Sequence, residues 1–434
     1  MFNVDWKNGK EHSWNFHPKG KGFDDRSYFL PLAVKAQYGK DDDFLLRLMK
    51  SKPAQFKRFI DKAKTYDLQI LYTRIDRTEN NSPQFTSYTY RLDADRYFYP
   101  ASTVKFPMVL LALEKINRLA VPGLNRFTPI RLDSVWSGQR TMTTDTSAFG
   151  GVPTIDHLAR KIFLVSDNEA FNTLYAFVGQ QEANETLRLK GYQARILHRL
   201  SRGGLTASEN RRTEPVTFYK RDSSIWKQPM LTADSMVVNK KILRAKGYYE
   251  NGRLIRKPMD FSYKNFFSLK DQQDMLMGLI FPEFTDRKRQ FNLSADDRRA
   301  VLQYMSQWPT ETIYPPYFQD SLFHNGYAKY LLAGGEAENL PAGVRIFNKI
   351  GGAYGYIIDN AYIVDFDNKI EFLLSAVLYT NRDGVLNDDR YDYEADAMPF
   401  MRNLGRLIYD HERNRVRLFT PDLSAFRLNY DLKH

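Results

Sequence analysis

A serine followed three positions later by a lysine can supply an activated nucleophile, and this chain has such a pair in Ser102-Thr103-Val104-Lys105. A serine hydroxyl is a weak nucleophile until a nearby base removes its proton. Residues three apart on a helix share a face, so a helix that begins here would hold the Lys105 amine near the Ser102 hydroxyl. Lysine must be neutral to act as a base. Burial and a second cation both lower a lysine pKa, and Lys349 is the candidate for that cation.

The sequence around this pair predicts a helix. Pro100 precedes the motif, and apolar residues recur at helical spacing over 106–116. Pro107 is a cost, since it lacks a backbone donor. A serine at the start of a helix has a free backbone N–H that can point at a developing oxyanion.

A Ser-x-x-Lys pattern is short enough to arise by chance, and it occurs again at Ser224-Ile225-Trp226-Lys227. There Gln228-Pro229 follows and would break a helix, so we interpret the second copy as a decoy. The alternative for Ser102 is an N-capping serine beside a solvated lysine.

Ser166-Asp167-Asn168 lies between two helical patterns, one capped by Thr154 and running to Val165, the other resuming at Glu169. This spacing places the three polar residues on a short loop, from which they can project into a cleft. A plain cluster of helix caps is the alternative interpretation, because Ser, Asp and Asn are all good caps.

Lys349-Ile350-Gly351-Gly352 lies on a predicted strand that begins near Val344. Strands are also predicted at 361–366 and 370–379, joined by a hairpin turn at Asp367-Asn368. A lysine on an edge strand suits an anion, and glycine lets a substrate approach the backbone closely. An edge lysine that only prevents aggregation is the alternative.

Together, in this order, the three motifs match S-x-x-K, S-D-N and K-T-G, and the chain therefore resembles the class A β-lactamases and penicillin-binding proteins. The resemblance implies an acyl-enzyme mechanism. Ser102 would be the nucleophile and Lys105 its base, and Ser166 would pass a proton to the leaving nitrogen.

The same resemblance implies the binding residues. Asn168 would hold the substrate amide and Lys349 the substrate carboxylate, and Gly351 would let the substrate approach the same strand closely. The backbone N–H groups of Ser102 and Gly352 would form the oxyanion hole. The family uses neither a metal nor another cofactor, so none is expected here.

Two departures from the family pattern bear on the second half of the reaction. The stretch 195–205, where the family has an omega-loop glutamate that activates the deacylating water, contains no Glu-x-x-x-Asn. Glu209 and Glu214 are the nearest acids, and His198 is either an alternative base or a histidine packed in a loop. Ile350 replaces the usual hydroxyl residue, which removes one hydrogen bond to a substrate carboxylate. We therefore expect acylation followed by slow deacylation.

The resemblance predicts an α+β fold of the β-lactamase/transpeptidase type: an antiparallel sheet flanked by helices plus a mostly helical subdomain, with the active site in the cleft between them. We expect an extended arm over 1–43, the hydrolase domain over 44–412 and a tail over 413–434. Within the domain, 64–100 and 344–412 would form the sheet part and 101–343 the helical part. The long separation of Ser166 from Lys349 implies an insertion, placed at 219–267 because that stretch departs from helical pattern.

Composition excludes several other classes. Of the 434 residues, 43% are hydrophobic and 26% charged, which are globular values. Zero cysteines exclude disulfides and thiol catalysis. The net charge of +12 is dispersed rather than clustered, so a nucleic-acid partner is not expected. The sequence contains no run that approaches 18 apolar residues, so no transmembrane helix is predicted. The first seven residues lack the features of a signal peptide, so either a signal has been trimmed or the protein is cytoplasmic. The resembled family works mainly outside the cytoplasmic membrane, so we expect a periplasmic or secreted protein whose signal has been trimmed.

Three functions follow as hypotheses. The first is a β-lactamase-like serine hydrolase acting on a small-molecule or peptidyl substrate, either a β-lactam or a cell-wall peptide. The second is a D-alanyl-D-alanine peptidase or an esterase on the same fold. The third is a catalytically silent protein that binds cell-wall peptides. The sequence gives no prediction of the oligomeric state.

Overall fold

The computed structural model describes residues 43–221, 223–236, 238, 240–337 and 340–431, which all belong to one compact unit of the chain. The predicted arm over 1–43 lies outside the described residues except for Asp43. The helices are α1 (Asp43–Lys50), α2 (Pro53–Asp61), α3 (Lys105–Leu119), α4 (Ile155–Val165), α5 (Asn168–Val178), α6 (Gln180–Leu189), α7 (Ala207–Asn210), α8 (Leu269–Ile280), α9 (Ala295–Ser306) and α10 (Met398–Asn414). The main strands are β1 (Gln69–Arg77), β2 (Pro83–Tyr90), β12 (Val344–Ala353), β13 (Tyr356–Asp365) and β14 (Ile370–Tyr379).

These five strands form one antiparallel sheet in the order β12-β13-β14-β1-β2. Strands from early and late in the chain meet at its centre, where Gln69 of β1 pairs with Val377 of β14. The turn between β13 and β14 is held by Asp365, whose carboxylate accepts hydrogen bonds from the backbone N–H groups of Asp367 and Asn368. This confirms the predicted hairpin turn and leaves β12, with Lys349, at an edge of the sheet.

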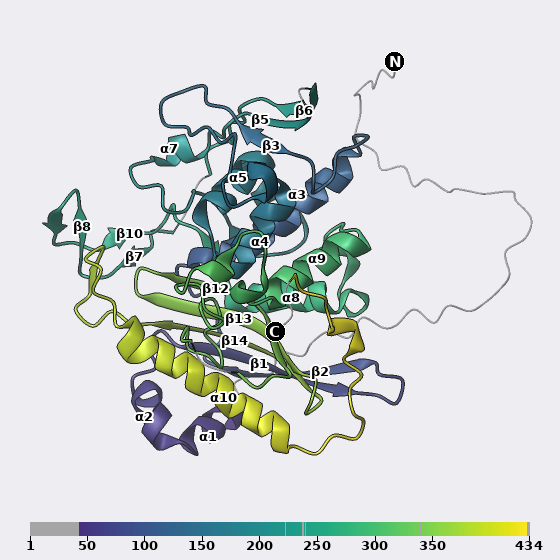
Figure 1. Ribbon diagram of the computed structural model, residues 1–434. Coiled ribbons are helices and arrows are strands. Elements are labelled where there is room, and N and C mark those ends of the chain that lie inside the picture. The colour runs from purple at the N-terminus through teal and green to yellow at the C-terminus, as the bar shows by residue number, and fades with distance from the viewer. Residues whose placement is uncertain (1–42, 222, 237, 239, 338–339, 432–434) are drawn as a thin grey trace, which may run out of the picture. The chain divides into compact units, whose positions relative to one another are not determined.

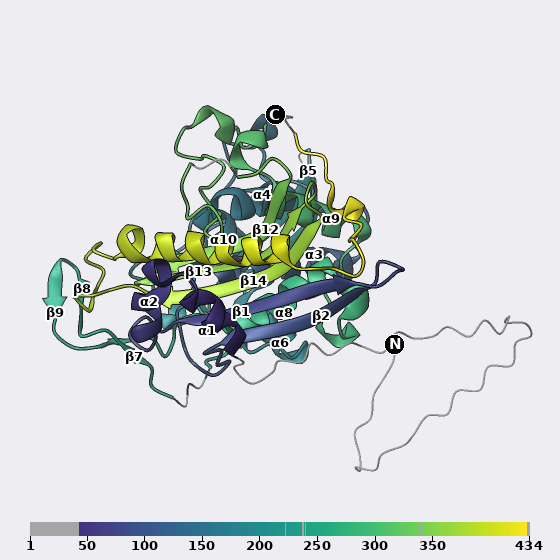
Figure 2. The ribbon, with the colours of Figure 1, turned by 90° about the horizontal axis from the view of Figure 1, so that it is seen from below.

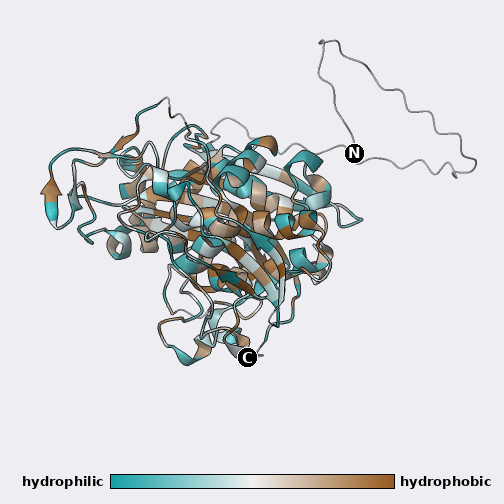
Figure 3. Cartoon of the chain, turned by 90° about the horizontal axis from the view of Figure 1, so that it is seen from above, coloured by the Kyte–Doolittle hydropathy of each residue, from teal (hydrophilic) through white to brown (hydrophobic). Residues whose placement is uncertain are grey.

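Helices cover both faces of the sheet (Figure 1). Figure 2 shows α1, α2 and α10 together on one face, over a core that includes Phe56, Tyr72 and Phe400. On the other face α8 crosses the sheet, with the side-chain amide of Gln273 donating to Leu71 O and Ser375 Oγ. A second core joins this face to α3, α4, α5 and α9, and Figure 3 shows hydrophobic residues gathered in these layers. This α+β architecture confirms the predicted fold class.

The helices begin where capping residues predict. Thr154 caps α4 by accepting from His157 N, and Asp167 caps α5 by accepting from Ala170 N. Ser268 and Ser294 cap α8 and α9 in the same way. Each cap satisfies a backbone N–H that has no partner inside its own helix.

The helix around Ser102 begins later than the sequence predicts. Ser102 lies on a 3-10 turn, η1 (Ala101–Val104), and α3 starts only at Lys105. Pro107 is consequently in the first turn of α3, where backbone N–H groups have no intrahelical partner, so its missing donor costs little.

Residues 219–267 are not helical, as expected. They carry short strands: β5 (Val216–Lys220), β6 (Ser223–Gln228), β7 (Leu243–Arg244), β8 (Gly247–Glu250), β9 (Arg253–Ile255), β10 (Met259–Asp260) and β11 (Phe266–Phe267). Asn251 and Gly252 turn the β8–β9 hairpin with φ of 50° and 76°, the conformation that an Asn-Gly pair favours. The other short strands are β3 (Ile130–Leu132), β4 (Ala194–Arg195) and β15 (Val385–Leu386).

The sequence did not predict a second irregular stretch. Between α9 and β12 the described residues contain only the short 3-10 turns η5 (Pro309–Glu311) and η6 (Tyr317–Gln319). In the part of the chain that the structure describes, no helix combines the length and the apolar character needed to cross a bilayer.

Candidate active site

The structure brings the three motifs together at the open edge of the sheet. Lys105 of α3 and Lys349 of β12 both reach the hydroxyl of Ser166, with Nζ–Oγ distances of 3.1 Å and 2.8 Å. Lys105 also donates to Asn168 Oδ1 at 2.7 Å and to the Ser166 carbonyl. Two chain segments 183 residues apart thus meet at one hydroxyl group.

A left-handed backbone conformation aims Ser166 at this position. Ser166 is the C-cap of α4, with φ of 60° and ψ of 39°, and its N–H donates to Lys161 O. The next residue, Asp167, already caps α5. The two helices are therefore joined by a single sharp corner, and strain of this kind is often retained at functional sites.

Burial lowers the pKa of both lysines. Lys105 is fully buried, and desolvation lowers its pKa to about 7, against the opposing attraction of Asp167. Desolvation likewise lowers the pKa of Lys349 well below its usual value, and the nearby charge of Lys105 lowers it further. The expected effect of a second cation on Lys105 is thus seen instead on Lys349, while burial accounts for the shift of Lys105.

Gly351 lets β12 lie directly against the turn η1, which carries Ser102. A Cβ at this position would come within 2.7 Å of Pro100 O and 3.2 Å of Ser102 N. Ala101, just before Ser102, has φ of 47°. The strand and the strained turn are therefore packed backbone against backbone, which only a residue without a side chain permits.

The Ser102 hydroxyl forms no hydrogen bond with any described residue, and the Lys105 amine bonds to Ser166 and Asn168 rather than to it. The predicted direct serine–lysine hydrogen bond is therefore not present among the described residues, and Lys105 is bonded to the second motif instead. Ser102 is half-buried and open to a ligand.

Lys105, Lys349, Ser166 and Asn168 form one hydrogen-bonded cluster. Ser201 belongs to it and was not predicted. Its hydroxyl accepts a hydrogen bond of 2.8 Å from Asn168 Nδ2, so Asn168 connects Lys105 to Ser201. An amide nitrogen has two hydrogens, so one remains for a substrate. The contact spans 33 residues, and nothing in the local pattern around Ser201 marks it.

The segment that carries Ser201 is fastened to α5 by a second asparagine. Asn172 Nδ2 donates to Leu200 O, and Asn172 Oδ1 accepts from Leu200 N, both at 3.0 Å. The Leu200 side chain is buried in the core. The residues of this segment nearest the lysine cluster are therefore an apolar side chain and a hydroxyl, neither of which is a strong base.

The two acids proposed as alternative bases are held elsewhere. Glu209 is an exposed member of the capping box of α7, and its hydrogen bonds from Thr206 lower its pKa. Glu214 is buried in an ion pair with Arg199, with a distance of 2.6 Å. Both carboxylates thus already have structural partners.

His198 is packed and neutral. Its ring stacks on Tyr99 with an interplanar angle of 5°, and Nδ1 donates to Arg199 O at 2.7 Å. Burial, assisted by Lys264, lowers its pKa to about 4. This arrangement agrees with the packed alternative for His198.

The second Ser-x-x-Lys copy is unsuited to the chemistry. Ser224 lies on β6, not on a helix, and is exposed. In a strand, Ser224 and Lys227 point to opposite faces, which agrees with its interpretation as a decoy.

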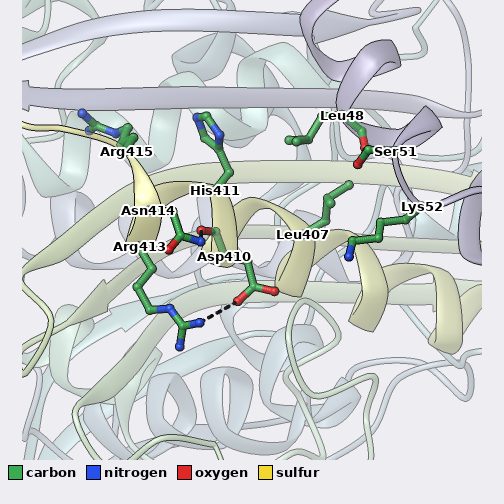
Figure 4. Close-up of a pocket in the computed structure, with 9 residues that line it drawn as sticks. All are labelled: Leu48, Ser51, Lys52, Leu407, Asp410, His411, Arg413, Asn414 and Arg415. Atoms are coloured by element: carbon green, nitrogen blue, oxygen red, sulfur yellow. Dashed lines mark hydrogen bonds and ion pairs between the residues drawn. The ribbon is translucent and has the colours of Figure 1, made fainter.

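A hollow on the far side of the sheet contains none of these residues. It lies between α1, α2 and α10 and is lined by Lys52, Asp410, His411 and Arg413, among others (Figure 4). Arg413 and Asp410 form an ion pair of 3.9 Å there. Among the described residues, no group of three or more His, Asp or Glu side chains is placed to hold a metal ion.

The model of the Beta-lactamase enzyme family matches residues 54–412, and no match was found among curated proteins. Similar solved structures include a beta lactamase from Xanthomonas campestris pv. campestris (16% identity, TM-score 0.46, covering 85% of this chain and 99% of that one). Another is a beta-lactamase from Desulfarculus baarsii (15%, 0.44, 85% and 99%), and a third is PBP-A (15%, 0.44, 85% and 94%).

A five-stranded antiparallel sheet between helical layers, with a serine–lysine site at its edge, is the architecture of the serine β-lactamases and penicillin-binding proteins. The family match covers most of the chain, so this protein belongs to the Beta-lactamase enzyme family.

Proposed function

We propose that this protein is a serine hydrolase that is acylated at Ser102 and releases its acyl group slowly. The observation that carries the proposal is the meeting of Lys105 and Lys349 on the Ser166 hydroxyl, beside the turn that holds Ser102. A protein that only bound peptides would have no use for two buried lysines whose pKa values are both lowered.

Acylation follows from these groups. The Ser102 oxygen attacks the substrate carbonyl carbon, and its proton passes to neutral Lys105. The backbone N–H groups of Ser102 and Gly352 stabilise the oxyanion. As the bond to the leaving group breaks, the Ser166 hydroxyl gives its proton to the leaving atom and is reprotonated from Lys105. The products are an ester on Ser102 and the protonated leaving group.

Lys349 has a different role from Lys105 in this proposal. A bound substrate carboxylate would oppose the burial that lowers the pKa of Lys349 and favour its charged form, which then holds the carboxylate. Gly351 keeps the strand close, and Asn168 holds the substrate amide. Ile350 is buried and offers no hydroxyl to the same carboxylate. Carboxylate binding is therefore electrostatic rather than a network of hydrogen bonds.

Deacylation requires a base beside a water molecule. Glu209 and Glu214 are engaged in a capping box and a buried ion pair, and Leu200 and Ser201 occupy the segment next to Asn168. We therefore propose burst kinetics with β-lactams, one equivalent of product followed by a slow steady state. A D-alanyl-D-alanine peptidase or esterase would use the same acylation chemistry. We place the protein in the periplasm or outside the cell, where its cell-wall substrates are.

A fluorescent penicillin separates these functions. The wild-type protein should give a covalent band that persists for minutes, and mass spectrometry should place the adduct on Ser102. The Ser102→Ala variant should give no band, whereas Ser224→Ala should label like wild type. Rapid loss of the band would indicate an efficient β-lactamase, and absence of any band with β-lactams and with esters would contradict the proposed chemistry.

A further inference from the structure

The irregular segment between α9 and β12 leads into the strand that carries Lys349 and is bonded to α4, at whose C-terminal end Ser166 lies. At its start, Ile313 N donates to the Asp431 carboxylate at 3.2 Å, and Asp431 also binds Arg160 of α4. At its end, Lys329 Nζ donates to Ile346 O and to Asn348 Oδ1 of β12, at 2.9 Å and 2.6 Å. The residues between these anchors are therefore tied at one end to α4 and at the other to β12.

This segment exposes large apolar side chains to solvent. Ile313 is 41% exposed and Tyr314 43%. From the loop before α4, Phe149 is 75% exposed and meets Tyr314 edge-on, with ring centroids 5.3 Å apart. We call Phe149, Ile313 and Tyr314 the aromatic rim. Phe318 and Leu322 continue the exposed apolar surface along the segment.

A charged network ties the aromatic rim to the candidate active site. Lys161 of α4 binds Asp145 at 2.8 Å and Asp167 at 3.2 Å. Asp145 N donates to Gly151 O at 3.0 Å, which closes the loop that displays Phe149. On the other segment, Tyr317 is close enough to Asp167 and Asp145 for both carboxylates to raise its pKa, after the larger effect of burial. The loop that displays Phe149 is thus linked through Asp145 and Lys161 to Asp167, the neighbour of Ser166, and Phe149 in turn contacts Tyr314.

Contiguous apolar side chains left in water next to a polar cleft are typical of a binding surface. We propose that the aromatic rim binds an apolar or aromatic group on the leaving side of the substrate. This inference rests on the proposed function, because the rim is linked through Asp145, Lys161 and Asp167 to Ser166, the residue that we propose protonates the leaving atom. The rim residues take no part in the chemistry and act on substrate preference alone.

Two esters with one acyl group test the proposal: N-acetylglycine benzyl ester and N-acetylglycine methyl ester, whose alcohols have similar acidity. Wild-type protein should acylate faster with the benzyl ester. Replacing both rings, Phe149→Ser with Tyr314→Ser, should lower kcat/KM for the benzyl ester roughly tenfold, mainly through KM. The methyl ester should change by less than about twofold, since it does not reach the rim. Leu418→Ser, which removes an exposed apolar residue near the β1–β2 hairpin instead, is the matched control.

Equal losses for the two esters, or no loss for either, would overturn the proposal. A change in oligomeric state on size-exclusion chromatography without a change in ester preference would also overturn it, and would make this face a contact between copies of the chain. If wild-type protein reacts with neither ester, the proposed function fails only when the fluorescent penicillin gives no band either. The rim is then tested by calorimetric titration with N-acetylglycine benzylamide and methylamide. Tighter benzylamide binding that the double variant loses supports the rim, and equal binding overturns it.

Discussion

Ser166 is hydrogen-bonded to two lysines, which limits how protons can be arranged around it. A hydroxyl has one hydrogen to donate and two lone pairs to accept. With Lys349 donating and Lys105 neutral, the Ser166 hydroxyl accepts from the first amine and donates to the second. Burial disfavours the charged form of both amines. When Lys105 loses a proton, its amine can accept a hydrogen bond from Ser166, which completes the series of bonds from Lys349 through Ser166 to Lys105.

Acylation should depend on pH through Lys105. Burial lowers its pKa to about 7, and the neutral amine is the base. The fraction of active base therefore increases as pH rises through 7 and decreases about tenfold per pH unit below it. Stopped-flow acylation with a neutral ester should show this rise between pH 5 and 8. Lys105→Ala should slow acylation by roughly 10²–10⁴ and remove the rise. An unchanged pH profile in Lys105→Ala would show that another group is the base.

At the scale of elements, the site depends on how closely β12 approaches the turn η1. Gly351→Ala would place a methyl group 2.7 Å from Pro100 O and 3.2 Å from Ser102 N. The strand must then move away from the nucleophile, and a displacement of about 1 Å can cost roughly 10²-fold in rate. We expect that loss in the acylation rate.

The control for Gly351→Ala is Gly278→Ala on α8, where the added methyl group meets only the Thr285 side chain, at 3.3 Å. Alanine also favours a helix over glycine. Gly278→Ala should keep wild-type acylation and stability. If Gly351→Ala is as active as this control, the close packing of β12 on Ser102 is not needed for the reaction.

The segment after β4 offers a second matched pair of variants. Glu214→Gln leaves buried Arg199 without a counter-charge, and breaking a buried pair typically costs about 3–5 kcal/mol. Glu209→Gln alters only an exposed capping box and should leave the unfolding free energy almost unchanged. Chemical denaturation measures both.

Neither variant should change the slow phase of nitrocefin hydrolysis, because neither carboxylate is free to activate water. Loss of the slow phase in Glu209→Gln would identify that residue as the deacylating base. Wild-type turnover above about 10 s⁻¹, the median for enzymes generally, would refute the proposal that the site lacks a deacylating base.

The elements near the site were predictable where local signals exist. The Thr154 cap, the Asp367-Asn368 turn and the apolar runs of β13 and β14 act over a few residues, so the sequence predicts them. The Lys349–Ser166 contact was predictable only through the resemblance, because no local pattern links residues so far apart. Ser201 and the aromatic rim were missed for the same reason: their partners are brought to them by the fold.

For the whole molecule, the sheet separates the candidate active site from a buried network that stabilises the fold. The candidate active site lies at one edge and on one side, while α10 packs on the other face (Figure 2). There the fully buried Glu412 accepts hydrogen bonds from Tyr72 of β1 and from Arg415 at 2.7 Å. This network fastens α10 to the sheet, far from the lysines of the site.

Glu412→Gln should therefore lower stability without altering the chemistry. It leaves Arg415 and Arg417 short of a counter-charge, at a cost of about 3–5 kcal/mol. Thermal unfolding should show a lower Tm, while the acylation rate per folded molecule at 20 °C remains that of wild type. The exposed Glu394 provides the control, since Glu394→Gln should change neither quantity. A fall in the rate in step with Tm would show that the two faces are coupled.

The order of strands in the sheet has a consequence for synthesis on the ribosome. β1 lies between β2, its neighbour in the chain, and β14, which is translated about 300 residues later. Until then the nascent chain carries β1 and β2 as a two-stranded ribbon whose β1 edge still lacks its partner β14, and such a ribbon is barely stable alone. The intervening helices can pack first, yet their sheet-facing side chains remain uncovered. Throughout that interval the growing chain depends on chaperones, or on the speed of translation, to avoid pairing that edge with the wrong partner.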